Sequence, residues 1–176
     1  MRKKLTIVLT VVVMLVCLCA CGAEPESGYD EATNQQISFH GTNFQIPATW
    51  MKQVEEEDNL LYGEMKDDGK NFVNCLTARF NEDSELNDYV SAVKDGLKLG
   101  NEKYGYNIGE VSQSDVTISN KPAIRMDYEE YIKGKKYMVI SIYIQVNEDI
   151  IGIGFVSPNK LDCADFEKVL GSIEIK

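Results

Sequence analysis

Three consecutive segments in the second half of the chain place alternate residues on two faces, and short turns join them. They span 123–132, 136–146 and 150–156, with Gly134 in the first turn and Asn147 in the second. Residues two apart on a strand share a face, so this period predicts three strands joined by hairpins. Hairpins join antiparallel strands. The pattern therefore constrains the chain to fold around an antiparallel meander.

Both faces of the predicted sheet need cover. The earlier segment 71–80 is partly apolar on each side, which is typical of a strand in a doubly covered sheet. Two amphipathic helices are expected to provide that cover, because apolar residues recur there three and four positions apart. The first is expected at about 84–103, and the second starts near Asp162 and ends at Gly171.

Shorter strands are predicted in the rest of the domain. Pro47 ends one of them, since proline cannot donate a ladder hydrogen bond. Trp50 follows three residues later and is predicted to plug the core at the end of the sheet. The shorter strands are expected at 37–40, 44–47, 53–58, 60–65 and, with a break, at 108–118.

Several of these features occur in an order that resembles a known family. They are Phe44-Gln45-Ile46-Pro47 with Trp50, the long helix, the turn Asn120-Lys121-Pro122-Ala123, and the final helix ending in Gly171-Ser172-Ile173. This order is similar to that of the PsbP-like domain, which also occurs in DcrB-type lipoproteins and in a Ran-binding import factor. The resemblance covers most of 37–176. It implies an α+β fold, an α/β/α sandwich around a largely antiparallel sheet, and it implies no shared catalytic motif.

The N-terminus has the parts of a secretory signal. Arg2-Lys3-Lys4 precedes the apolar stretch 5–20, which is shorter than the roughly 20 residues of a membrane-spanning helix. Of the three cysteines at its end, only Cys21 directly follows a small residue, Ala20, with Leu18 three positions upstream. This pattern resembles the lipobox of bacterial lipoproteins. It predicts cleavage before Cys21 and attachment of a diacylglyceryl group to its thiol.

The chain is therefore expected to have three parts. Residues 1–20 form a lipoprotein signal peptide, 21–36 a lipidated flexible tether, and 37–176 a single PsbP-like domain. The expected location is the extracytoplasmic side of the cell membrane. Cleavage removes three of the 18 basic residues and none of the 28 acidic ones, so the formal charge falls from −10 to −13. With no basic stripe, this charge disfavours nucleic acid as a partner.

Two cysteines remain in the predicted domain. Cys75 is expected in a strand and Cys163 at the start of the final helix. Outside the cytoplasm a disulfide between them is chemically permitted. Two buried free thiols are the alternative, because a disulfide requires a geometry that sequence does not specify.

The sequence lacks the residues of common catalytic and metal sites. Its one histidine, His40, is expected in a surface turn beside Gly41, and no Gly-x-Ser-x-Gly motif is present. One histidine also excludes zinc sites that need several. The acidic run 55–58 lacks the spaced ligands of an EF-hand and is expected to be solvated. No cofactor and no enzymatic activity are expected. A cell-envelope hydrolase that uses paired carboxylates is the alternative.

Tyrosines are the remaining candidates for a binding site. Tyr137 and Tyr143 share one face of a predicted strand, where they could form a ligand platform or simply stabilise the sheet. The sequence therefore favours an anchored, non-enzymatic binding or assembly module. Its partner would be an envelope protein, a cell-wall fragment or a small ligand.

Overall fold

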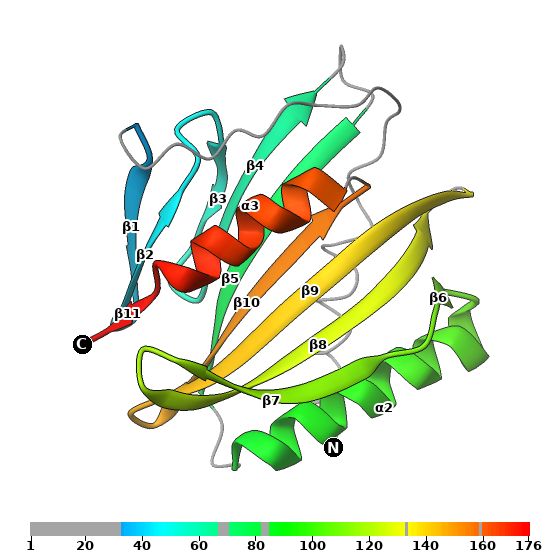
Figure 1. Cartoon of the computed structure of the whole chain (residues 1–176). Helices are drawn as coiled ribbons and strands as arrows, with labels where there is room; N and C mark the ends of the chain where they lie inside the picture. Colours follow the sequence, from blue (N-terminus) through cyan, green and yellow to red (C-terminus); the bar gives the residue numbers. More distant parts are fainter. Residues whose placement is uncertain (1–32, 67–70, 82–84, 133, 159) are drawn as a thin grey trace.

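An antiparallel sheet of eight strands forms the centre of the described structure (Figure 1). The computed structural model describes residues 33–66, 71–81, 85–132, 134–158 and 160–176. The strands pair in the order β3-β4-β5-β10-β9-β8-β6, and β7 also pairs with β8. Their bounds are β3 Met51–Glu55, β4 Asn59–Lys66, β5 Asn71–Asn81, β6 Asn107–Ile108, β7 Ser112–Ile118, β8 Lys121–Ile132, β9 Lys135–Val146 and β10 Asp149–Ser157.

The predicted meander is confirmed as β8, β9 and β10. Strand β8 pairs with β9, and β9 with β10, both antiparallel. The two turns use left-handed backbone at Gly134, with φ of 79°, and at Asn147, with φ of 57°. The hairpin before β8 places Ser119 and Asn120 at φ of 49° and 62°. Two successive left-handed residues are what a type I′ hairpin turn requires.

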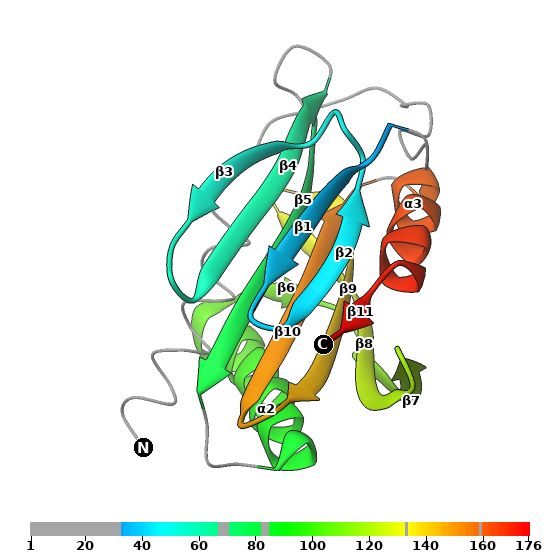
Figure 2. The same ribbon diagram turned by 90° about the vertical axis from the view of Figure 1, so that its left-hand side faces the viewer.

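A second, three-stranded sheet joins the two ends of the described chain. It comprises β1 (Gln35–Phe39), β2 (Thr42–Ile46) and β11 (Glu174–Ile175), with β2 in the middle. Figure 2 shows it beside the final helix on one face of the central sheet. The Gln45 amide donates to Oγ of Ser172 at 2.8 Å, and the Lys176 amide donates to the Gly41 carbonyl at 2.9 Å. The C-terminal segment, predicted as an extended tail, is therefore an edge strand.

Two helices in the described part of the chain lie on opposite faces of the central sheet (Figure 1). Helix α2 (Leu86–Tyr104) covers one face, and α3 (Lys160–Gly171) packs against β10, β9 and β2 on the other. The apolar stripe of α2 is buried as its spacing predicts. Gly105, at φ of 69°, ends this helix in the left-handed conformation. The predicted α+β fold with helices on both faces is confirmed.

An aromatic stack ties three distant segments together on the α3 side. Phe166 of α3 stacks on Phe155 of β10, with centroids 4.5 Å apart and planes 9° from parallel. Trp50 stacks on Phe155 at 5.9 Å and 17°. All three rings are buried, so Trp50 plugs the core as predicted. The stack holds α3 and the segment after β2 against the sheet.

Cys75 of β5 lies in the same α3-side core. Its side chain is 2% exposed, and burial raises the pKa of the Cys75 thiol to about 12. Burial acts in this direction because it disfavours the charged thiolate. The side chain of Cys163 lies outside the described residues, so the Cys75–Cys163 disulfide stays a prediction.

Replacing Phe166 with Ala should destabilise the domain by about 3–5 kcal/mol, because it removes a buried ring and leaves a cavity against Phe155. Urea denaturation followed by Trp50 fluorescence measures the change. Met51→Ala is the matched control, since Met51 is 73% exposed and its loss should cost less than about 0.5 kcal/mol. Equal costs for the two variants would show that the stack does not anchor α3.

Cys75 should resist alkylation in the folded protein. With the pKa of Cys75 raised to about 12, little thiolate exists at pH 8, whereas an unfolded thiol has a pKa of about 8.5. Iodoacetamide should therefore react at least about 100-fold faster in urea, as measured by peptide mass spectrometry. Rapid reaction of the native protein would contradict this burial. If both cysteines react in urea only after a reductant is added, the disulfide is present instead.

Candidate binding groove

A groove of about 530 Å³ opens on the α3 side of the central sheet, where β8 and β9 emerge from beneath the helix. Met138 and Ile140 of β9 contribute apolar surface to it. Ala164 and Glu167 of α3 line one side. The link between β6 and β7 lines another. Small-molecule and peptide sites have volumes of this order, with apolar surface and a few polar groups.

A break between β6 and β7 shapes one side of the groove. Strand β6 pairs with β8 near Tyr131, whereas β7 pairs with β8 only up to Asp127, which confirms the predicted broken strand. The amide of Asn101 on α2 holds Ile108 of β6, donating to its carbonyl at 2.7 Å and accepting from its N–H at 2.9 Å. The N–H of Gly109 then donates to the Glu129 carbonyl at 2.7 Å. The link is thereby fixed against the edge of β8.

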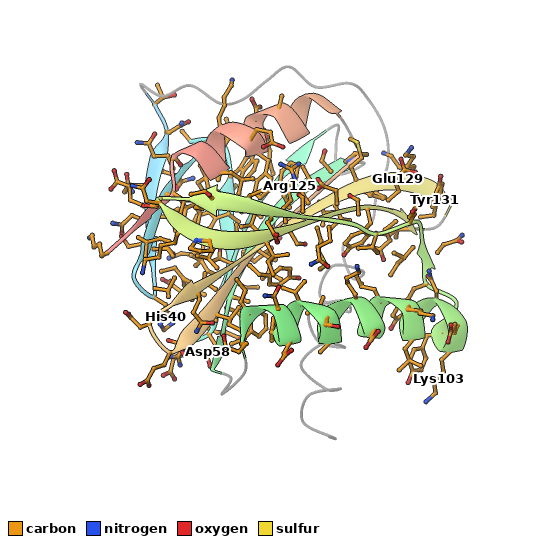
Figure 3. The ribbon with its side chains drawn as sticks, turned by 60° about the horizontal axis from the view of Figure 1, so that its bottom comes forward. His40, Asp58, Lys103, Arg125, Glu129 and Tyr131 are labelled. Carbon is orange, nitrogen blue, oxygen red and sulfur yellow. The ribbon has the colours of Figure 1, made fainter. Side chains whose placement is uncertain are left out.

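Arg125 is the central charge of the groove, and Figure 3 shows it close to α3. Its Nε and Nη2 donate to the two carboxylate oxygens of Asp127, both at 2.7 Å. Nη2 also lies 2.7 Å from Oε1 of Glu167 on α3. Hydrogen bonds to Asp127 and then to Glu167 raise the pKa of Arg125. The charge of the guanidinium is thus paired with two carboxylates, which take three of its five N–H donors.

The rest of the rim is acidic. Glu129 is ion-paired with Lys136, and both side chains are about half exposed. Glu110 is exposed and has neither an ion pair nor a hydrogen bond to its carboxylate among the described residues. Four carboxylates line the groove, against the two cations Arg125 and Lys136 that pair with them. The groove therefore carries a net negative charge.

Glu130, the buried carboxyl next to Glu129 in sequence, faces away from the groove. Glu130 is 4% exposed, and burial raises its pKa, which favours the protonated form. It alternates along β8 with Glu129 and Asp127 and so lies on the α2 side of the sheet. Glu130 is the described carboxyl whose pKa is raised by burial, and it is therefore not part of the open groove.

A second charged cluster lies at the opposite end of the sheet (Figure 3). Arg79 of β5 binds Asp58 at 2.6 Å and approaches Asp149 at 3.7 Å. Nε2 of His40 lies 2.6 Å from the carbonyl oxygen of Glu57, and His40 has φ of 41° as a turn residue. The acidic run is thus a solvated hairpin, as predicted. Among the described residues no group of three or more His, Cys, Asp or Glu side chains is placed to hold a metal ion.

The structure places Tyr137 and Tyr143 in the core under α2. They are 2% and 6% exposed, and the Tyr143 ring lies 5.7 Å from that of Tyr89 on the helix. Burial raises the pKa of Tyr143 to about 12. The two residues share a face, as the sequence indicates, but α2 covers that face. They stabilise the sheet and offer no open platform to a ligand.

The remaining predicted site residue, Cys21, lies outside the described residues. No helix in the described part of the chain has both the length and the apolar character needed to span a bilayer. The residues of the groove were not predicted from sequence. The sequence signal that could have indicated them is the charged residue at every second position of β8. These residues face helix α3, which begins more than 30 residues later in the chain.

The fold can be compared with known proteins. No protein-family model matches the chain, and no curated protein matches it at a significant level. Among solved structures, the cyanobacterial PsbP protein (CyanoP) of Synechocystis sp. PCC 6803 aligns with a TM-score of 0.61 at 11% identity, covering 87% of this chain and 98% of that one. LpqN, a Mycobacterium tuberculosis protein involved in cell envelope biogenesis, aligns at 0.52 and 12% identity, covering 81% and 90%.

A Bacteroides thetaiotaomicron protein aligns with a TM-score of 0.55 at 15% identity, covering 82% of this chain. This chain spans about half the length of that protein, 49%. At 11–15% identity these likenesses bear on the fold alone. The central antiparallel sheet, with a helix on each face, is a PsbP-like α+β fold.

Proposed function

We propose that the protein is a lipid-anchored, extracytoplasmic component of the cell envelope whose folded domain is a non-enzymatic binding or assembly module. The sequence around Cys21 supports the anchor. The similarity to LpqN, a protein involved in cell envelope biogenesis, is compatible with this location. The domain's part of the proposal rests on the groove.

The pairing of charges in the groove is the observation that carries the binding role. A catalytic acid or base needs an accessible proton and a pKa suited to its task. Arg125 is instead held by Asp127 and Glu167, and these bonds fix the side chains in place. Fixed polar groups beside the apolar Met138 and Ile140 suit recognition of a partner.

The alternative, a carboxylate-based hydrolase, has less support. It requires two carboxyl groups in one open site, one of them protonated at neutral pH. Glu130 is the described carboxyl that burial biases toward the protonated form, and it lies on the face under α2. The groove carboxylates lie on the other face.

The length of the tether suits a role close to the membrane. Thirteen residues lie between Cys21 and Gln35, where β1 begins. A flexible chain of this length has an end-to-end distance of about 20 Å. The domain would therefore sample a thin layer above the bilayer and meet partners confined to the same layer.

The anchor predicts that cells expressing the full chain incorporate a labelled lipid precursor into the protein. The Cys21→Ala variant should incorporate none, because it lacks the thiol that accepts the lipid. Gel fluorography after metabolic labelling measures this, with Cys75→Ala as a control that should label normally. An unlabelled wild-type protein, or a labelled Cys21→Ala protein, would exclude the anchor.

The assembly role predicts recovery of specific neighbours in intact cells. A proximity-labelling enzyme fused after Lys176 should label a reproducible set of envelope proteins, and the unanchored Cys21→Ala variant should label fewer of them. Quantitative mass spectrometry compares the two samples. If the anchored protein enriches nothing over the unanchored one, the assembly role is wrong.

A further inference from the structure

The geometry of the groove points to the class of its ligand. We propose that the groove binds an extended peptide segment that carries a lysine or arginine side chain. The aliphatic stem of that side chain lies on Met138 and Ile140, and its charged end is held by Glu110 and Glu129. This inference rests on the proposed binding function and names the chemistry of its partner.

The existing ion pairs decide the sign of the ligand's charge. An anionic group would have to approach Arg125 beside the carboxylates of Asp127 and Glu167, to which the guanidinium already donates three hydrogen bonds of 2.7 Å. A cationic group, by contrast, meets a carboxylate that is not yet paired. The carboxylate of Glu110 has no partner among the described residues, and an incoming cation neutralises it without breaking any bond.

The second carboxylate is also open to exchange. Glu129 is paired with Lys136, but the two side chains are 46% and 50% exposed. Exposed pairs of this kind contribute little stability, so a ligand cation can share or replace Lys136 at small cost. The formal charge of −13 expected for the mature chain adds long-range attraction for basic partners.

The shape of the groove favours a peptide over a lone amine. Strand β8 lines it from Arg125 to Glu129, a run of about 13 Å at the usual rise per residue. That length matches about four extended residues of a ligand. Apolar contacts come from Met138, whose thioether adapts to different shapes, and from Ile140. Lysine and arginine side chains have an apolar stem of methylene groups and a charged end. One such side chain can therefore contact both the apolar residues and the carboxylates of the groove.

NMR titration of the folded domain with blocked peptides tests this inference. The probe is acetyl-Gly-Leu-Lys-Leu-Gly-amide, and two matched peptides carry norleucine or glutamate in place of lysine. The lysine peptide should shift the amide signals of Gly109, Glu110 and Ala164, and it should bind at least about fivefold more tightly than the norleucine peptide. The difference should shrink at high salt, which screens exposed charges.

The Glu110→Gln variant should weaken binding of the lysine peptide by about threefold to fivefold and leave the norleucine peptide unaffected. Glu102→Gln is the matched control, because Glu102 is an exposed carboxylate on α2, away from the groove. Both positions are exposed, so both variants should keep the wild-type pattern of dispersed amide signals.

Two results would overturn the inference. One is equal or tighter binding of the norleucine or glutamate peptide, and the other is the absence of any shift at the groove with all three peptides. Neither result decides the assembly role, which is tested separately by recovery of envelope neighbours in intact cells. Loss of those neighbours together with intact lysine-peptide binding would overturn the assembly role and leave the groove chemistry standing.

Discussion

Burial of both faces of β9 and β10 is the constraint on which the rest of this structure depends. In β10, Ile151, Ile153 and Phe155 pack toward α3, while Ile150 and Val156 pack toward α2. Each strand must therefore be apolar on both sides, which gives it no polar face to turn to solvent. Gly152 makes this packing fit, since a Cβ there would lie 3.1 Å from the Phe80 ring and 3.2 Å from that of Tyr143. Two helices are required because neither face can be left open to water.

The groove follows from where this cover ends. Helix α3 packs against β10 and β9 of the central sheet and against β2 of the smaller sheet. On β8 the residues facing α3 change from the buried Ala123 to the charged Arg125, Asp127 and Glu129. The sheet thus continues past the edge of the helix, and its surface becomes polar there. The Arg125–Glu167 ion pair marks the boundary between the covered and the open part.

Local patterns were sufficient to predict most elements, and long-range pairing was not. The meander, both helices and the plug at Trp50 follow from periodicity and turn residues, which act over a few positions. The contact of β11 with β2 joins residues more than 120 apart, and nothing in Glu174–Ile175 specifies its partner. The exposure of the tyrosines was also beyond the reach of local patterns. Period two places Tyr137 and Tyr143 on one face, but only tertiary packing decides that α2 covers it. Arg125 and Glu167 likewise meet only after α3 docks.

The groove combines a fixed half with an adaptable one, and this division determines how it would recognise the peptide proposed above. Arg125, Asp127 and Glu167 hold one another, so they lose little side-chain freedom on binding. Glu110, Glu129 and Met138 can adjust to the ligand. Exposed charges of this kind give modest and salt-dependent affinity. For a domain anchored as proposed, modest affinity would be sufficient, because a tether holds it in the same thin layer as an envelope partner and raises their local concentration. The weak binding proposed for the groove would therefore complement the attachment proposed at Cys21.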